Sequence, residues 1–522
     1  MSWIVIGEEH GKIKLVSKSG VSGQLPKGAY LTIEEGKTKF ILRVDKTQQD
    51  EPYAPSPLLA DMDLSLLKQD QRCQNIVWAH RVIDISDRQD GLIDFIKPQL
   101  PARRSTQEEI SVALENIKEG PEVFVATIHS GKNQILIDDS HKMITARLPD
   151  DMFFHQMLVC GKTGSGKTVA TKYLAQYFVE KFEGAVLAVN VKDVDLLHMD
   201  RASETKNKEL LNEWSVLKQK PHKVDNFVIY HPANTTISKT KGVTAICKPI
   251  TLDVRRIDPE SLTGLLQGIS DIGAQHLPNI FRHWQEHMKR SKDDENFKFI
   301  NFVNYLSSAD TLTFPTLNVR GEESETTLHR GTFDNILRNL NVATDFFDSP
   351  GAKFIDETDI LTNGKMSVID TTGKNGIQFG SILLRDLLHR IVTAKSEQTS
   401  KVPILIVIDE VHRFYETGTA REALGDLDTI CRTGRSQRIG VIFSSQNPED
   451  MPSGLSTVIN TKIFFKSDAK QAKQQGLMIS PEEMESLKKG YAVASIHDLS
   501  QLKILKFPLA FAGVFEKGEE SE

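Results

Sequence analysis

The segment GKTGSGKT, residues 161–168, constrains the fold of this chain more than any other stretch. It matches the pattern G-x-x-x-x-G-K-[ST], in which glycines allow the backbone amides to wrap around phosphate oxygens. The apolar run MLVC (157–160) precedes it, and the helical pattern of TVATKYLAQYFVEKFEG (168–184) follows it. A strand, a glycine-rich loop and the N-terminus of a helix, in this order, indicate a phosphate-binding site. The candidates for contact with phosphate are Gly161, Lys162, Thr163, Gly164, Ser165, Gly166, Lys167 and Thr168.

Two side chains of this loop predict the chemistry of the bound nucleotide. Lys167 is expected to reach the β- and γ-phosphates, and Thr168 is expected to ligate Mg²⁺. ATP and Mg²⁺ are therefore the expected cofactors. The alternative is a chance glycine-rich turn, which the flanking strand and helix disfavour.

A second pair of candidates lies at the end of ILIVIDE, residues 404–410. Asp409 is expected to hold Mg²⁺ through its water shell, and Glu410 is expected to polarise the attacking water as a general base. The alternative is a pair of carboxylates at a strand end that faces solvent. Asp370, at the end of MSVID (366–370), is a weaker candidate because no glutamate follows it.

Beyond residue 150 the sequence predicts an α/β core with a parallel sheet. Continuous apolar runs, rather than alternating ones, indicate strands that are covered on both faces. These runs are MLVC (157–160), VLAVNV (186–191), MSVID (366–370), ILIVID (404–409), GVIFSS (440–445) and KIFF (462–465). Strand patterns are absent from about 255 to 350, so we expect a helical insertion there. The core then comprises 151–254 and 351–512, the insertion 255–350, and an acidic tail 513–522.

Residues 1–150 are expected to form a small N-terminal β-barrel with connecting segments. Short strand patterns separated by glycine and charged turns are typical of such barrels. The runs are SWIVIG, KIKLVS, YLTIEE, KFILRV, EVFVATIH and QILIDD. The Pro- and charge-rich stretch from TQQDEPYAPSPLL to ISDRQDGLIDFIKPQLPARRS (47–105) is expected to form connecting loops.

The composition disfavours several classes of protein. A net charge of −6 supplies no overall basic field for nucleic acid, although a basic channel inside an acidic shell is compatible with it. The four cysteines lie far apart without a C-x-x-C pair, which argues against a zinc knuckle or a disulfide framework and fits a reducing compartment. We find no apolar run of 18 residues and no signal-peptide pattern, so we expect a cytoplasmic protein without a membrane span.

The stretch CRTGRSQRIGVIFSSQNPED (431–450) has three arginines before an apolar run that ends in Ser-Ser-Gln. If that run is a strand beside the Asp409 strand, Gln446 points at the same crevice and can hydrogen-bond the γ-phosphate or the water. Arginines that precede the strand would lie at the domain edge, from which they can reach the nucleotide of a neighbouring subunit in a ring. The alternative is that all three are ordinary surface charges: Arg432, Arg435 and Arg438.

Five motifs together resemble the HerA–FtsK branch of hexameric P-loop ATPases, and bacterial HerA-like proteins in particular. The motifs are VCGKTGSGKT, AVNVKDVDLL, LIVIDEVHRF, GRSQRIGVIFSSQNPEDMP and KGYAVASI. The resemblance covers about 150–510 and, more weakly, the barrel, which is similar to the HerA/ATP-synthase-type cap. It implies a RecA-like core in a homohexamer that uses ATP to move double-stranded DNA through its pore, with a separate nuclease or other effector docked on the barrel.

By motif, the resemblance assigns roles to individual side chains. It implies that Arg435 is the finger supplied in trans and that Gln446 is the sensor, beside the phosphate and metal residues named above. In the family the loop after the strand 186–191 approaches the pore, so Lys192 is implied as a contact to DNA phosphate; the alternative is a solvated lysine.

This sequence departs from the family pattern just before the phosphate-loop strand. Many archaeal relatives carry an arginine there as a second trans residue, whereas this chain has His155-Gln156. Arg147 and Arg432 are the candidate replacements.

Two functions stay open on this basis. The first is a DNA translocase or helicase that works with a partner nuclease or other effector in DNA end processing or anti-phage defence. The second is a ring-shaped scaffold, regulated by ATP, that assembles and activates a separate effector with little translocation of its own. We find no nuclease signature in the sequence, so a partner is expected in either case. A pump at a membrane is disfavoured because no membrane segment is evident.

Overall fold

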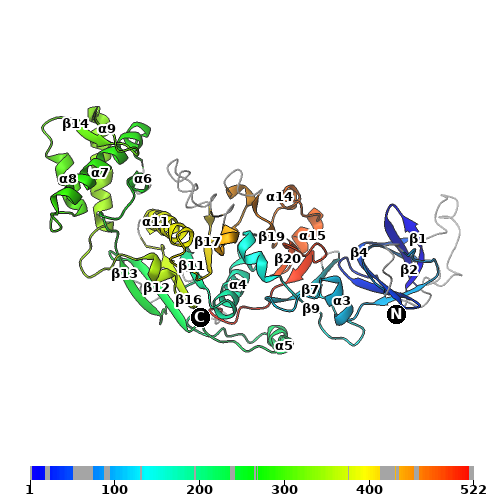
Figure 1. The fold of residues 1–522 in the computed structure, drawn as a ribbon. Coiled ribbons are helices and arrows are strands. Elements are labelled where there is room, and N and C mark those ends of the chain that lie inside the picture. Colours follow the sequence, from blue (N-terminus) through cyan, green and yellow to red (C-terminus); the bar gives the residue numbers. More distant parts are fainter. Residues whose placement is uncertain are drawn as a thin grey trace, which may run out of the picture.

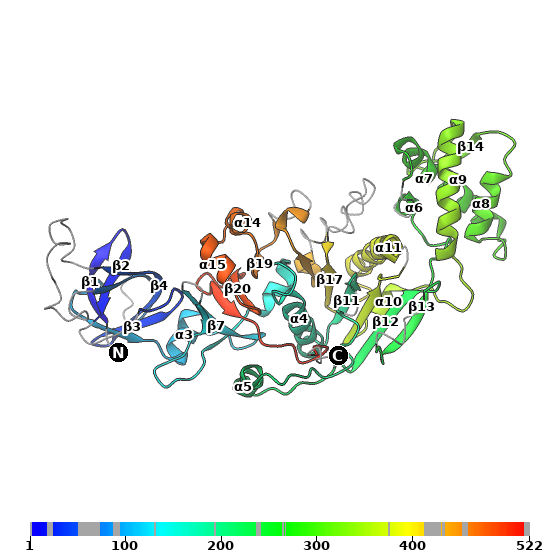
Figure 2. The same ribbon diagram turned by 180° about the vertical axis from the view of Figure 1, so that it is seen from behind.

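The computed structural model describes residues 3–17, 24–50, 74–86, 94–129, 132–192, 195–235, 242–263, 266, 268–373, 376–411, 430, 434–451 and 458–515. These residues form three parts that follow one another along an elongated molecule (Figure 1). A closed β-barrel lies at one end, a large sheet with its helices lies in the middle, and a mainly helical lobe lies at the other end. Figure 2 shows the same order from behind.

The predicted N-terminal barrel is confirmed. It closes in the strand order β1-β2-β5-β4-β3-β6, and all neighbouring strands are antiparallel. Alternate side chains, such as Ile13 and Leu15 of β2, are buried in its interior because successive side chains of a strand point to opposite faces. The barrel strands are β1 (Trp3–Glu9), β2 (Lys12–Ser17), β3 (Tyr30–Glu35), β4 (Thr38–Asp50), β5 (Gln74–Ile85) and β6 (Pro101–Arg104).

The prediction of connecting loops over 47–105 is wrong in part. β4 extends to Asp50, and β5 pairs with it along its whole length, from Gln74 to Ile85. Val77 and Ala79 of β5 are fully buried in the barrel. These few apolar residues are sufficient to form a barrel strand, because only one face of such a strand needs to be apolar. The charged residues around them make this alternation hard to recognise in the sequence.

Two runs assigned to the barrel belong instead to the large sheet. EVFVATIH is β7 (Glu122–His129), which pairs with β21 (Ile504–Lys506), and β8 (Lys132–Ile135), from the run QILIDD, pairs with β7. The prediction is wrong here because six consecutive residues of β7, Val123–Ile128, are buried. Such a continuous buried run is typical of a strand covered on both faces, and the strand beside it, β21, comes from the far end of the chain.

The predicted α/β core is confirmed as a sheet of 13 strands in the described part of the chain. Its order is β13-β12-β16-β11-β17-β18-β10-β19-β20-β21-β7-β8, with β9 paired to β7. The strands from β13 to β19 are parallel, and all six predicted runs are among them. The remaining bounds are β9 (Thr145–Arg147), β10 (Met157–Cys160), β11 (Ala185–Asn190), β12 (Asn226–Pro232), β13 (Ile246–Ile250), β16 (Lys365–Asp370), β17 (Ile404–Asp409), β18 (Ile439–Ser445), β19 (Thr461–Phe464) and β20 (Tyr491–Ser495).

The lobe at the far end contains helices and one hairpin. Asp258 caps the first helix by accepting a hydrogen bond from the backbone N–H of Ser261, as its position before Pro259 suggests. The expectation that strands are absent from 255–350 is wrong, because β14 (Thr313–Leu317) pairs with β15 (Glu323–Thr327). The strand β14 packs on α7 (Asp271–Ser291), and the buried Phe314 stacks on Phe333 with 5.9 Å between ring centroids.

Four helices in the described residues, α4, α7, α9 and α11, have 14 to 21 residues, and the others are shorter. None of the described helices is long and apolar enough to cross a membrane. Their bounds are α3 (Gln107–Ala113), η2 (Asp150–His155), α4 (Lys167–Lys181), α5 (Lys208–Val216), α6 (Pro259–Leu262), α7 (Asp271–Ser291), α8 (Phe299–Ser307), α9 (Arg330–Ala343), η5 (Thr344–Phe346), α10 (Glu357–Ile360), α11 (Gly376–Ser396), η8 (Pro448–Asp450), α14 (Ala469–Gln474) and α15 (Pro481–Ser486).

Candidate nucleotide-binding site

The phosphate loop (residues 161–168) connects the central strand β10 to the N-terminus of α4. Its tight conformation requires glycine at two positions. A Cβ atom on Gly166, which has φ +114°, would lie 2.8 Å from the backbone nitrogen of Gly490, and a Cβ on Gly161 would lie 2.7 Å from Ser165 Oγ. Glycine therefore keeps this turn open for a ligand that packs against backbone atoms.

Polar atoms of the loop are oriented as a phosphate group requires. Lys167 is 6% exposed, and its Nζ donates to the carbonyl oxygens of Gly161 at 2.5 Å and Lys162 at 3.3 Å. The buried Ser165 Oγ has no hydrogen-bond partner in the described part of the chain. Burial lowers the pKa of Lys167, so an anion beside its ammonium group is electrostatically favoured. These residues fit the triphosphate of a nucleotide.

The acidic pair at the end of β17 is buried. Asp409 is 8% exposed and Glu410 is 1% exposed, so the alternative of two carboxylates that face solvent does not hold. Ser444 Oγ donates to Asp409 Oδ1 at 2.7 Å, while burial raises the pKa of Asp409. Glu410 has φ +47°, a left-handed conformation that is uncommon outside glycine, and this turn directs its side chain across the sheet edge.

Among the described residues, two side chains donate to the Glu410 carboxylate. Lys192 Nζ forms an ion pair with Glu410 Oε1, and Gln446 Nε2 donates to the same oxygen at 3.2 Å. Lys192 follows β11 and Gln446 follows β18, which are the two neighbours of β17. The carboxyl ends of three adjacent strands therefore meet at Glu410.

The strand order explains why Gln446 lies there. β18 is inserted between the phosphate-loop strand β10 and β17, with Ser445 opposite Cys160 and Ser444 opposite Asp409. The predicted adjacency of this strand to the Asp409 strand is confirmed. Ser444 was not among the predicted site residues, although the polar end of an otherwise apolar strand is a signal that could have identified it.

Asp370 and Asn190 lie opposite each other at the ends of the neighbouring strands β16 and β11. Asn190 Nδ2 donates to Asp370 Oδ1 at 3.1 Å, and Thr372 Oγ1 donates to the same oxygen at 2.9 Å. Asn190 Oδ1 also accepts from the backbone N–H of Leu196 at 3.1 Å. These bonds anchor the turn after β11 and so direct Lys192 toward Glu410.

Arg435 lies away from the phosphate loop of its own chain. It is exposed just before β18, at the strand end opposite to Gln446. Seven strand residues separate the two ends, which corresponds to about 20 Å. Arg438 is also exposed, and its guanidinium carbon lies 5.5 Å from the centre of the Phe154 ring. Arg432 lies outside the described residues.

The His155-Gln156 position contributes to packing. Gln156 is 1% exposed, and its Oε1 accepts from the backbone N–H of Val441 at 2.8 Å. The His155 ring stacks on His497 with 3.6 Å between ring centroids. Arg147 is partly exposed and lies 3.4 Å from the Glu122 carboxylate. It stays a candidate for the second trans arginine.

Metal coordination at this site would depend on the nucleotide. Thr168 is half-buried in the first turn of α4, and Asp409 ends β17. The described part of the chain contains no group of three or more His, Cys, Asp or Glu side chains that could hold a metal ion. Phosphate oxygens and water would therefore have to supply most ligands of Mg²⁺, as is usual for this ion.

Comparisons with known proteins agree on one family for the central region. Residues 136–395 match the family model of the helicase HerA central domain. The DNA double-strand break repair helicase HerA of Sulfolobus acidocaldarius is 24% identical over 193 residues, which are 35% of this chain and 39% of that relative. The aligned part of the chain thus spans about two fifths of the length of this relative.

Two solved structures align with most of this chain at TM-scores below 0.5. The bacterial conjugative coupling protein TrwBΔN70 aligns with a TM-score of 0.47 at 13% identity, over 79% of this chain and 93% of that chain. VirB4 of Thermoanaerobacter pseudethanolicus aligns with a TM-score of 0.44 at 12% identity, over 75% of this chain and 97% of that chain.

Proposed function

We propose that this chain is a HerA-like, ATP-driven translocase or helicase for double-stranded DNA, since its residues 136–395 match the family model of the helicase HerA central domain. The observation that carries the proposal is the buried Asp409–Glu410 pair, two strands away from a glycine cradle that fits phosphate. The name of the Sulfolobus relative supports DNA as the substrate.

The residues of the site supply the steps of hydrolysis. Lys167 and the loop amides would bind the β- and γ-phosphates of ATP, and Thr168 and Asp409 would hold Mg²⁺ together with water. The bound ion would supply positive charge beside the phosphates. Glu410 accepts a proton from the attacking water, and Gln446 orients that water or the γ-phosphate from the neighbouring strand.

Lys192 offers a physical link between DNA and hydrolysis. One ammonium group can bind either the Glu410 carboxylate or a DNA phosphate with full strength, because its positive charge is a single point. In our proposal a DNA phosphate withdraws Lys192 from Glu410, and the carboxylate, no longer paired with this ammonium group, then orients the attacking water. DNA would therefore stimulate hydrolysis.

The proposed working form is a homohexamer in the cytoplasm. Arg435 is exposed and about 20 Å from the phosphate end of its strand, so a contact to nucleotide requires a neighbouring subunit. A nuclease or other effector would dock on the N-terminal barrel, and DNA end processing and anti-phage defence are the proposed settings.

The test is ATP hydrolysis by the purified chain with and without linear duplex DNA, combined with a mass measurement in solution. We expect a hexamer whose hydrolysis rises with DNA and falls as salt increases, since phosphate contacts are screened by salt. The ATP-regulated scaffold would be favoured instead if the rate of hydrolysis did not change with DNA and the assembled ring still activated an effector. If a monomer hydrolysed ATP at the full rate, the proposal of a hexameric working form would be overturned.

A further inference from the structure

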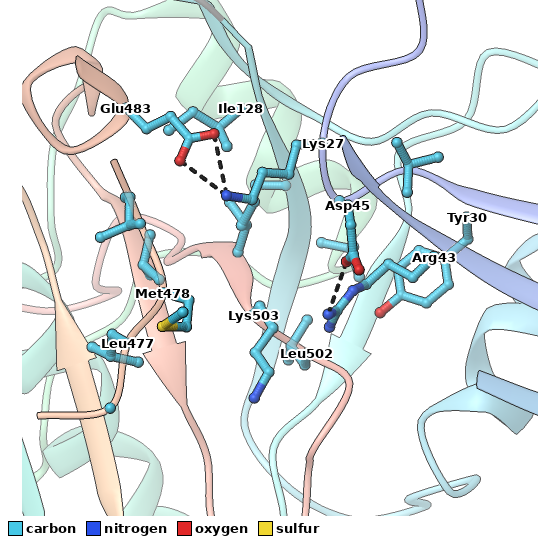
Figure 3. A pocket seen from close by; sticks show the side chains of 18 of the residues that line it. Lys27, Tyr30, Arg43, Asp45, Ile128, Leu477, Met478, Glu483, Leu502 and Lys503 are labelled. Carbon is cyan, nitrogen blue, oxygen red and sulfur yellow. Dashed lines mark hydrogen bonds and ion pairs between the residues drawn. The ribbon is translucent and has the colours of Figure 1, made fainter. Parts of the chain in front are cut away.

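A cavity of about 400 Å³ lies where the barrel meets the large sheet. Figure 3 shows most of its lining residues. They include residues of β2, β3 and β4 of the barrel, of β7, β20 and β21 of the sheet, of the turn between α14 and α15, and of α15 itself. Its volume lies within the range of about 300–1,000 Å³ that is typical of small-molecule sites. The phosphate loop and the Asp409–Glu410 pair do not line it.

The cavity has an apolar wall. Ile128, Leu477, Leu502 and Ile504 line it, and each of these side chains is almost completely buried. Met478 lies at the rim and is 76% exposed. A ligand with an apolar body would therefore bury hydrocarbon surface here, which favours binding.

The charges that line the cavity are unequal. The four cations are Lys12, Lys27, Arg43 and Lys503, and the two carboxylates are Asp45 and Glu483. The Lys27 ammonium is already paired with Glu483 at 2.9 Å. The lining therefore carries a net positive charge.

The Asp45 carboxylate lies close to three basic side chains. It lies 3.2 Å from Lys12, 3.5 Å from Arg43 and 3.0 Å from the Nδ1 atom of His80. Burial alone would raise the pKa of Asp45, but hydrogen bonds from His80 and Lys12 hold it below its usual range. This carboxylate is thus ionised, and its charge is shared among three groups.

Lys503 has no partner of this kind. The described residues include no hydrogen bond or ion pair to its Nζ. Burial lowers the pKa of Lys503, and the positive charge of Arg43 lowers it further, so two cations act on each other across the same cavity. An anion between them would relieve both effects.

We propose that this cavity is a binding site for an organic anion in which a carboxylate is attached to an apolar body. The carboxylate contacts the ammonium group of Lys503 and the guanidinium group of Arg43, and the apolar body packs on Ile128, Leu477 and Leu502. Arg43 Nη1 also donates to the backbone oxygen of Gln501 at 2.5 Å, as does the Tyr30 hydroxyl at 2.9 Å. The ligand would therefore bridge the barrel strand β4 and the segment before β21.

The test is calorimetric titration of the full-length protein with octanoate. We expect octanoate to bind, and we expect octan-1-ol and acetate to bind at least tenfold more weakly, because the first lacks the charge and the second lacks the apolar body. Lys503→Gln should weaken octanoate binding by about tenfold or more, as expected for loss of a hydrogen bond to a charged group. Lys223→Gln, an exposed lysine outside the cavity, is the matched control.

A second variant keeps the test valid if Lys503→Gln fails to fold. Met478→Asp changes an exposed side chain at the rim and should weaken octanoate binding by repulsion, whereas Met478→Gln should not. Absence of octanoate binding to the unaltered protein would overturn the proposal. Equal binding by the unaltered protein, Lys503→Gln and Met478→Asp would overturn it as well. Neither outcome depends on ATP hydrolysis, so the proposal and the proposed function fail separately.

Discussion

Lys192 and Glu410 form an ion pair between the ends of the neighbouring strands β11 and β17, although 217 residues separate them in the chain. Glu410 is almost completely buried, whereas the Lys192 side chain is 29% exposed. The proposed catalytic base is thus buried, whereas its cationic partner is partly accessible to solvent. This difference is what would allow an external phosphate to act on the base.

Replacement of Lys192 is expected to separate basal from stimulated hydrolysis. In Lys192→Met the Glu410 carboxylate loses its cation, so we expect ATP hydrolysis without DNA to rise severalfold and DNA stimulation to disappear. Steady-state hydrolysis with and without duplex DNA measures both. Lys208→Met, an exposed lysine on α5, serves as control. An unchanged ratio of stimulated to basal rate would refute the link.

Removal of the Lys167 ammonium should abolish hydrolysis. In Lys167→Ala a buried cation that contacts the loop carbonyls is lost, and we expect the rate to fall by about 100-fold or more. Binding of a fluorescent ATP analogue should weaken in parallel. Lys181→Ala, at the exposed end of the same helix, controls for general effects on α4. Retained hydrolysis in Lys167→Ala would mean that the phosphate site lies elsewhere.

Glu410→Gln should uncouple binding from hydrolysis. The amide keeps the shape of the side chain and cannot accept a proton, so the rate should fall by about 100- to 10,000-fold while ATP still binds. Equilibrium binding and single-turnover hydrolysis separate the two effects. If a co-purified effector stays fully active with this variant but requires the assembled ring, the scaffold function gains support over translocation.

Arg435 is expected to act on the nucleotide of the neighbouring subunit. Arg435→Ala should reduce hydrolysis by about 1,000-fold, as loss of an arginine finger does, without weakening ATP binding to an isolated subunit. Mixed rings of Arg435→Ala and Lys167→Ala subunits should regain part of the activity, because some interfaces then combine an intact loop with an intact arginine. Arg320→Ala, exposed in the far lobe, is the control. Failure of every mixing ratio to restore activity would argue against a trans role.

The barrel contains a pH-dependent contribution to stability. Burial would raise the pKa of Glu109, but hydrogen bonds from Arg103 and the Thr106 backbone lower it to about 2, from an ordinary value of 4.5. Because the pKa is lowered on folding, this stabilisation is present above pH 4.5 and is lost as the pH falls toward 2. Glu109→Gln should therefore cost about 3 kcal/mol near neutral pH and less at pH 3.5. Thermal unfolding at the two pH values measures the difference; an equal loss at both would contradict the assignment.

Local patterns in the sequence were sufficient for the elements of the core. The phosphate loop, its strand and its helix are predicted by neighbouring residues alone, and so is ILIVIDE as a buried strand that ends in two acids. Strands with only one apolar face were harder to recognise. β5 was missed for this reason, and the hairpin β14–β15 was missed because Glu323–Thr327 is polar throughout.

The sequence by itself determined the chemical groups of the candidate site, because each motif is a contiguous run whose conformation depends on residues nearby. Only the tertiary structure decided how the strands are ordered. It inserted β18 between β10 and β17 and so brought Ser444 to Asp409 and Gln446 to Glu410. It also pairs Lys192 with Glu410, and it places β7 in the large sheet and not in the barrel. The physical reason is that strand order follows from hydrogen bonding and packing between segments far apart in the chain, which no local pattern encodes.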